Sequence, residues 1–387
     1  MNHLRVTQLA ALSAALSITG CSSMSNYATT PTTPVTPAAP AAVIAQLATT
    51  TTIGSTVDPT NGDANPYGLA IAPITAGLMT AGDLIVCNFN DSKGNAGAGT
   101  TIVDLKPVAG SKPTRIAQDA TLAGCNSLAL NPGGNIWAAA YTANDNPIFT
   151  PAGTLATTLS SSYAWMQPWG QVFATPTLPA GSTATAPKAF YITDAGDGSV
   201  IQSNITSAGL VFNKIITGFP HSVSTTYGIL APAGLTYDPS TDTLYVVSSD
   251  TNSVLAFSAV STIPAGGVVI NFTPSSSSGG SYPTTTAAAF SFTGPAAAQA
   301  SVIYSGTPLN YPISAALLYN GDLVVGNTGD NNLVEIQPST KAVLGTKSVD
   351  TGNPGAIFGI VTSGTTLATQ KIFFNDDNAN TVIQISQ

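Results

Sequence analysis

From about Val43 to its end, the chain alternates short apolar runs with short polar turns. A typical unit reads PAGLTYDPSTDTLYVVSSDTNSVLAFS, from Pro232 to Ser258. The apolar runs hold only four to seven residues, and no 3.6-residue period is sustained across them. Such runs, separated by Asp, Asn, Gly and Pro, predict β-strands joined by tight turns. We therefore expect an all-β fold built from small antiparallel sheets.

The same unit recurs along the chain. Related segments span residues 65–105, 125–146, 188–203, 232–258, 312–337 and 355–386. One small sheet cannot bury both of its faces alone, whereas sheets arranged radially cover one another. A repeat of about 45–55 residues therefore predicts a β-propeller. Six blades are expected. Seven would require a weak blade between Ser258 and Tyr311, where SSSSGGSYPTTTAAA instead indicates a low-complexity insertion at an outer edge.

The two ends of this repeat region predict how the ring closes. The last unit stops after what reads as its third strand, Thr381–Ser386. The strand-like segment VIAQLATTTTIG, from Val43 to Gly54, can supply the missing outer strand of that blade. Such pairing joins the two ends and removes an exposed sheet edge.

The first residues of the chain predict export and a lipid anchor. Arg5 precedes an apolar run from Val6 to Ile18, which is too short to span a membrane. The run leads into Thr19-Gly20-Cys21, which resembles the bacterial lipobox. In that family the chain is cut before the cysteine, whose thiol is acylated. A plain secretory peptide followed by an incidental cysteine is the alternative.

This reading divides the chain into three parts. Residues 1–20 are the expected signal peptide, residues 21–42 a lipidated cysteine and a tether rich in Pro, Thr and Ala, and residues 43–387 a single propeller. By resemblance to enterobacterial lipoproteins, Ser22 in place of the retention aspartate favours the outer membrane over the inner membrane.

Composition limits the partners. Only 7% of the residues are charged and the formal net charge is −8, with no cluster of Lys or Arg. This balance argues against nucleic acid and anionic lipid headgroups as partners. Membrane attachment is expected through the lipid on Cys21 alone, and the propeller is expected to be a monomer.

Three segments carry a family resemblance. LYVVSSDTNSVLAFS, LVVGNTGDNNLVEIQPST and IFFNDDNANTVIQIS resemble the NHL and YVTN-type repeats of bacterial extracytoplasmic propellers. The starts of two units, at Pro66-Tyr-Gly and Pro232-Ala-Gly, are also similar to NHL repeats. The basic residue that NHL repeats carry before the third strand is replaced here by Ser199, Ser253, Asn332 and Thr381. The resemblance implies a propeller and leaves its activity open.

The Asp/Asn turns between second and third strands form the first candidate site. Topology places these turns on the face where the first strands start, and we expect that face to bind any ligand. Its residues are Asp194, Asp197, Asp250, Asn252, Asn327, Asp330, Asp376 and Asn378. Asx-turns alone would explain the same composition. Asp376, Asn378 and Asn380 also match the start of a Ca²⁺ loop that lacks the later Gly and Glu, so no metal or other cofactor is expected.

Cysteines in an oxidising compartment provide a further expectation. If Cys21 is lipidated, Cys87 and Cys125 remain as an even pair on neighbouring blades. They form either a disulfide or two buried thiols.

The remaining candidates have structural explanations. His221 is the only histidine after the predicted signal peptide, so a catalytic triad or multi-histidine metal site lacks a partner. Tyr163, Trp165 and Trp169 suit packing between blades as well as sugar stacking, and Trp137 suits the core.

Two functions follow from these observations. The first is a non-catalytic module at the cell envelope that binds a protein or a carbohydrate, or serves as a scaffold there. The second is a metal-dependent lactonase of the gluconolactonase-like propeller type. Such enzymes typically carry a glutamate near the start of the chain, whereas Glu335 is the only glutamate here. We therefore expect the binding module.

Overall fold

The computed structural model describes residues 41–207, 209–224, 228–273 and 289–387, without the side chains of residues 222–230. The predicted signal peptide, Cys21 and nearly all of the tether lie in residues 1–40, outside the described residues. Residues 40–387 form one compact unit. Across the described ranges, no helix has the length and apolar character needed to cross a membrane.

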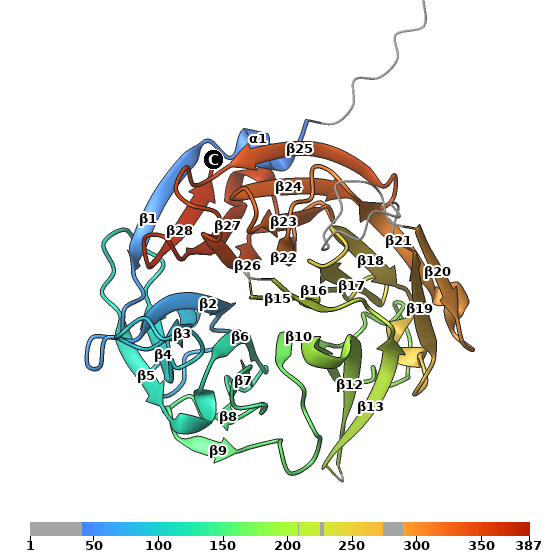
Figure 1. The fold of residues 1–387 in the computed structure, drawn as a ribbon, viewed down its shortest axis with the longest axis horizontal. Helices are drawn as coiled ribbons and strands as arrows, with labels where there is room; N and C mark the ends of the chain where they lie inside the picture. The colour runs from blue at the N-terminus through green and yellow to red at the C-terminus, as the bar shows by residue number, and fades with distance from the viewer. Residues whose placement is uncertain (1–40, 208, 225–227, 274–288) are drawn as a thin grey trace, which may run out of the picture. The chain divides into compact units, whose positions relative to one another are not determined.

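Six antiparallel sheets are arranged in a ring, which confirms the six-bladed propeller (Figure 1). Blade 1 comprises β2 (Ala64–Ile71), β3 (Leu84–Asn90), β4 (Thr101–Leu105) and β5 (Thr114–Gln118). Blade 2 comprises β6 (Cys125–Leu130), β7 (Ile136–Ala140), β8 (Ile148–Phe149) and β9 (Leu155–Thr157). Blade 3 begins with β10 (Pro168–Ala174), β11 (Ala189–Asp194), β12 (Ser199–Thr206) and β13 (Gly209–Thr217).

The other three blades repeat this order. Blade 4 comprises β16 (Pro232–Asp238), β17 (Thr243–Ser248), β18 (Ser253–Phe257) and β21 (Ala300–Ser305). Blade 5 comprises β22 (Pro312–Leu317), β23 (Leu323–Asn327), β24 (Asn332–Gln337) and β25 (Ala342–Ser348). Blade 6 comprises β26 (Ile357–Ser363), β27 (Lys371–Asp376), β28 (Thr381–Ser386) and β1 (Thr49–Ser55). Short elements connect them: η1 (Ala120–Leu122), η2 (Ala195–Asp197), β14 (Ser222–Ser224), β15 (Gly228–Leu230), η3 (Val260–Thr262), η4 (Ala297–Gln299) and η5 (Leu367–Thr369).

The N-terminal strand closes the ring as predicted. β1 pairs antiparallel with β28, from Thr49 opposite Ser386 to Ser55 opposite Thr381. The prediction that residues 43–54 form one strand is wrong at its start, because Val43–Gln46 form the short helix α1. Buried Glu335 on β24 accepts hydrogen bonds from the backbone N–H groups of Val43 and Ile44, at 2.9 and 2.8 Å. This contact holds the chain in a turn before β1 begins.

The described residues between Ser258 and Tyr311, 259–273 and 289–310, form no seventh blade. Its β19 (Val268–Thr273) and β20 (Ala289–Thr293) form a hairpin that extends the sheet of blade 3 to six strands. β19 pairs in parallel with the end of β13, with Ile216 opposite Val268. β21 then returns to complete blade 4. The β19–β20 hairpin therefore lies at an outer edge of blade 3. The Ser/Thr-rich segment, for which an outer edge was predicted, lies outside the described residues apart from Ala289.

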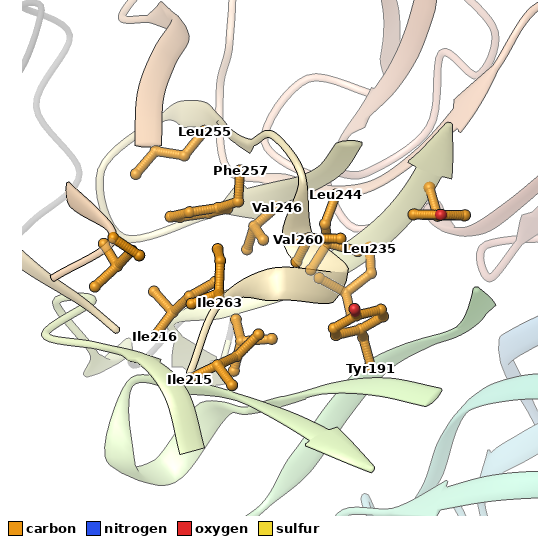
Figure 2. Packing of buried hydrophobic residues seen from close by; sticks show 14 of the residues in the cluster. Tyr191, Ile215, Ile216, Leu235, Leu244, Val246, Leu255, Phe257, Val260 and Ile263 are labelled. Carbon is orange, nitrogen blue, oxygen red and sulfur yellow. The ribbon is translucent and has the colours of Figure 1, made fainter. Parts of the chain in front are cut away.

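The core lies between adjacent blades. Figure 2 shows the contact between blades 3 and 4, where side chains of β11 and β13 meet those of β16, β17 and β18. Tyr191, Ile216, Val246 and Phe257 are fully buried there. Because the second and third strands are covered by blades on both faces, they read as nearly continuous apolar runs.

Candidate ligand site in the central channel

The first strand of each blade faces the axis of the ring. β2, β6, β10, β16, β22 and β26 each stand at one end of their sheet and contact the first strands of both neighbouring blades. They enclose a cavity of about 430 Å³. Because each first strand pairs with only one other strand, its second edge is left without a partner strand. The wall of the cavity is therefore built from peptide groups and from small, aliphatic and aromatic side chains.

All six first strands carry a register irregularity near their start. The strand pairing shifts at Pro66/Gly68, Cys125/Ser127, Pro168/Gln171, Pro232/Leu235, Pro312/Ser314 and Ile357/Ile360. In four of these strands a glycine lies within or at the end of the shift, where the next blade is very close. A Cβ atom on Gly170 would lie 2.1 Å from the carbonyl oxygen of Ala233, and one on Gly359 would lie 2.6 Å from that of Tyr67. The Pro-x-Gly starts seen in the sequence thus mark the closest approach between blades.

A side chain joins every pair of neighbouring blades at this level. Between blades 3 and 4, Thr193 Oγ1 donates a 2.7 Å hydrogen bond to the carbonyl oxygen of Ala233. Between blades 6 and 1, Asn375 Nδ2 donates to that of Gly68 at 3.1 Å. The other junctions use Asn126 Nδ2 with Pro168 O at 3.1 Å, Ser249 Oγ with Pro312 O, and Ser314 Oγ with Phe358 O.

The junction between blades 1 and 2 is covalent. Cys87 and Cys125 form a disulfide with their Cα atoms 5.9 Å apart, within the range that a disulfide requires. Both residues are fully buried. Cys87 directly precedes the residue that pairs with the start of the first strand, which is also the place of Thr193 and Asn375 in their blades. The disulfide therefore stands where other blades use a hydrogen bond.

Aromatic side chains converge at the end of the channel where the first strands start. The ring of Tyr67 stacks on those of Phe89 and Phe358, with centroids 4.3 and 3.6 Å apart. Trp169 of blade 3 lies 6.3 Å from Tyr67 of blade 1, although blade 2 separates them along the ring. Ala233, Ile313 and Tyr141 belong to the same cluster. We call this cluster the aromatic layer, and it narrows the channel at this face.

The opposite end of the channel is more exposed. At the aromatic end, the large side chains of Trp169 and Ile313 are buried, as are Asn126 and Ala233, whereas Tyr67 and Phe358 are half-buried, as are the small residues Ser127, Ser314 and Gly359. At the other end the lining residues are Ile71, Leu130, Phe173, Tyr237, Leu317 and Thr362, and all except Tyr237 are half-buried. The cavity is thus a pit whose wider mouth faces the ends of the first strands.

The structure does not support the predicted ligand face of Asp and Asn side chains. Register pairs each first-strand start with the end of the second strand, such as Pro168 with Asp194, so the turns do share one face. However, Asp194, Asp250, Asn252 and Asn327 are at most 2% exposed, and Asp376 is buried. Of the other three, Asp197 and Asp330 are half-buried and Asn378 is exposed. The five buried side chains therefore do not project into solvent.

The hydrogen bonds of these residues explain their burial. Asp194 Oδ1 accepts from Met166 N at 2.7 Å, Asn252 Oδ1 from Tyr311 N at 2.8 Å, and Asp376 Oδ1 from Ala379 N at 3.2 Å. Asn327 Nδ2 donates to Pro308 O at 2.8 Å. Asp330 Oδ1 accepts from Asn332 N at 3.2 Å, and Asp197 binds Lys214 and Ser199. Asx-turns and caps of this kind are the structural alternative expected from the sequence for these Asp and Asn residues.

The Ca²⁺ candidate is not assembled either. Asn380 Oδ1 accepts a 2.7 Å hydrogen bond from Asn65 N, and Asn378 Nδ2 donates to Asp350 Oδ1 at 2.9 Å. Asp376 already accepts from Ala379, so the three side chains serve different backbone and side-chain partners. Within the described residues, no group of three or more His, Cys, Asp and Glu side chains is placed to hold a metal ion.

Two buried carboxyl groups on this face have altered proton affinity. Burial, and to a smaller extent the charge of Asp197, raises the pKa of Asp194 to about 7. Burial, together with neighbouring Asp376, raises the pKa of Asp377 to about 7. Burial, and to a smaller extent the charge of Asp377, raises the pKa of the Tyr67 phenol. Both carboxyl groups are thus charged only at neutral pH and above.

The other candidates from the sequence have structural surroundings. Trp165 is buried against Phe212, with centroids 5.6 Å apart, and Tyr163 also packs on Phe212. Trp137 is buried against Phe190. The exposed His221 has its Nδ1 3.3 Å from the carbonyl oxygen of Phe219.

Sequence reasoning missed most of the aromatic layer. Tyr67, Trp169 and Phe358 all directly precede the glycine near the start of a first strand. That shared position is the signal that would have grouped them.

These features define a six-bladed β-propeller with a narrow-ended, uncharged central pit. No family model matches the chain, and no curated protein matches it. Solved structures are similar in fold. One is virginiamycin B lyase from Staphylococcus aureus, at 13% identity and a TM-score of 0.48, over 88% of this chain and 98% of that one. Another is a nidogen/laminin complex, at 15% identity and 0.49, over 80% and 87%. A streptogramin B lyase structure is 14% identical at 0.47, over 85% and 96%.

Proposed function

We propose that the protein is a non-catalytic binding module of the cell envelope. It is held at the membrane by a lipid on Cys21, and its ligand-binding site lies in the central channel. The channel composition carries this proposal. Among the described residues that line it, the side chains are small, aliphatic, aromatic or neutral polar, from Gly68 and Ser127 to Trp169 and Gln171. These groups provide contact area and hydrogen bonds.

Two polar side chains of the channel wall, those of Gln171 and Thr362, are already hydrogen-bonded to other protein groups. Gln171 Nε2 donates to the carbonyl oxygens of Ser127 and Trp137, at 3.0 and 2.6 Å, and its Oε1 accepts from Asn146 Nδ2 at 2.8 Å. Thr362 Oγ1 donates to Leu317 O at 2.6 Å. A propeller lactonase would need acidic and amide ligands free to converge on the axis, and the described lining does not favour that alternative.

The anchor is proposed from the sequence signal at Ile18-Thr19-Gly20-Cys21. Residues 22–40 would then connect the lipid to the propeller. The described chain starts beside blade 5, where Ala42 and Val43 are buried. An outer-membrane location is proposed on the same basis, from Ser22.

A cysteine substitution tests the anchor. The full chain and the Cys21→Ala variant are expressed in a Gram-negative host fed an alkyne analogue of palmitate, and the envelope is fractionated. The wild type is expected to carry the label in the membrane fraction, and the variant to be soluble, folded and unlabelled. The Cys87→Ala/Cys125→Ala variant is the matched control and should remain labelled. Membrane retention of the Cys21→Ala variant would contradict the anchor.

A second assay separates binding from catalysis. The purified propeller is incubated with a panel of lactones with and without a chelator. No hydrolysis above buffer is expected, and chelator-sensitive hydrolysis would replace the binding proposal with the lactonase.

A further inference from the structure

We propose that the central pit takes an uncharged small molecule with at least one apolar ring, and that this ligand enters through the wide mouth formed by the ends of the first strands. This inference rests on the proposed function, because it names the ligand class of the same channel. It follows from the wall, from the charge inside the pit and from the difference between its two ends.

The wall offers hydrogen bonds without charge. Six strand edges line the channel, and none of them has a partner strand on the axial side. Some of their carbonyl groups are occupied by the side chains at the blade junctions, such as Gly68 O by Asn375. The remaining peptide groups, with the half-buried hydroxyl-bearing Ser127 and Thr236, are neutral donors and acceptors that a neutral polar group can use.

An ion would enter this pit without a partner. The described lining contains no Asp, Glu, Lys, Arg or His side chain, and its one phenol near the mouth, Tyr237, donates to Asp242 at 2.9 Å. Moving an ion out of water costs several kcal/mol unless an opposite charge is placed beside it. The pit therefore discriminates against charged molecules of the same shape.

The aromatic layer gives the pit a floor. Tyr67 is stacked on both faces, by Phe89 and Phe358, so it is not free to take a ligand ring between them. Trp169 is 8% exposed and meets Tyr141 edge to face, at 5.5 Å between centroids. The partly exposed side chains instead gather at the other end, around Ile71, Leu130 and Leu317.

The size of the pit fits one small molecule. Its volume of about 430 Å³ lies within the range of about 300–1,000 Å³ that ligand pockets of proteins usually have. An apolar ring at the mouth would cover Leu130 and Leu317, while a neutral donor or acceptor would reach the strand edges below.

Two fluorescent probes with the same skeleton test the charge rule. N-phenylnaphthylamine is neutral, and anilinonaphthalene sulfonate carries the same rings and one added sulfonate. Each probe is titrated into the purified propeller, and binding is followed by the rise in probe emission and by energy transfer from tryptophan. We expect saturable binding of one neutral probe per chain, at least about tenfold tighter than that of the sulfonate.

Two variants locate the binding. Leu130→Trp adds bulk at the wide mouth and is expected to weaken binding of the neutral probe by at least about tenfold. Leu78→Trp makes the same exchange at a residue that is 50% exposed and outside the channel lining, and should leave binding unchanged. Thr362→Phe obstructs the mouth from blade 6 and repeats the test if Leu130→Trp fails to fold, as judged by its far-ultraviolet spectrum.

The outcomes separate the two proposals. Tighter neutral binding that both mouth variants abolish supports the inference. If the sulfonate probe binds as tightly as the neutral probe and is equally sensitive to Leu130→Trp, the predicted discrimination against charged ligands is wrong, while the channel remains the ligand-binding site. If the mouth variants change the affinity of neither probe, the channel is not the ligand-binding site and the proposed function fails as well.

Discussion

Replacing both Cys87 and Cys125 by alanine measures how much the covalent junction contributes to the ring. The two residues are 38 positions apart in the chain. Closing a loop of that length in the unfolded chain removes about 13 cal/mol/K of entropy, which is about 4 kcal/mol at room temperature. Since blades 1 and 2 also pack through Ile85, Ile102 and Leu128, the native ring should still form without the bond.

The expected shift in melting temperature follows from the size of the domain. Roughly 345 residues, from Val43 to Gln387, unfold with an entropy of about 0.7 kcal/mol/K, so a loss of about 4 kcal/mol lowers the Tm by about 5 °C. Calorimetry and guanidinium unfolding of the oxidised wild type, the reduced wild type and the double variant measure this change. The variant should melt slightly below the reduced wild type, because it also lacks the two buried sulfur atoms.

The matched control is Thr193→Ala. Thr193 occupies the equivalent place in blade 3 without a covalent bond: its Oγ1 donates to Ala233 O and accepts from Gly170 N. Its loss should cost about 2 kcal/mol and lower the Tm by about 3 °C. Both cysteines are fully buried, so reductant should open the disulfide only as the protein unfolds. A double variant that melts within about 1 °C of the wild type would refute the entropic reasoning.

The remaining predictions concern the N-terminal docking and pH. Glu335→Ala leaves the buried N–H groups of Val43 and Ile44 without acceptors and should lower the free energy of unfolding by about 2–5 kcal/mol, whereas Glu335→Gln keeps one acceptor and should cost less. Hydrogen exchange at Val43 and Ile44 should be slowest in the wild type, faster in Glu335→Gln and fastest in Glu335→Ala. Equal exchange rates in all three proteins would contradict this prediction. Asp194 and Asp377 have folded-state pKa values of about 7, above the ordinary 3.8, so the stability linked to them is present in acid and lost as pH rises from about 4 to about 7. The Tm should therefore fall over that range, and Asp194→Asn should flatten the fall; a variant profile parallel to the wild type would count against Asp194.

The repeat and the ring closure could be predicted because both depend on short stretches of sequence that can be recognised one at a time. Each strand is an apolar run between turn residues, and the count of such units gives the count of blades. The helix α1 could not be predicted this way, because Val-Ile-Ala-Gln suits a strand equally well. Its conformation depends on Glu335, a partner 292 residues away. A single sequence does not show which distant residue lies opposite.

The candidate site shows the same limit. The Asp and Asn turns were correctly placed on one face, but their use depends on contacts between blades, such as Asn252 with Tyr311, 59 residues further on. Residue type alone was compatible both with Asx-turns and with polar side chains free for a ligand. The fold instead uses them to satisfy buried backbone groups, which would otherwise be left without partners at every turn.

The low charge of the chain and the way its blades are joined have one physical explanation. The ion pairs of the described residues are made around single blades: Lys106 with Asp83 and Asp104, Arg115 with Asp58, and Lys214 with Asp197. The six junctions between blades use hydroxyl and amide donors on backbone carbonyls, or the disulfide. A buried hydrogen bond between neutral groups avoids the desolvation that a buried ion pair must overcome, and salt does not screen it. Five such junctions and the disulfide surround an axis whose described lining has no charged side chain. The blades are therefore joined without ion pairs, and the pit that they enclose is lined by neutral groups.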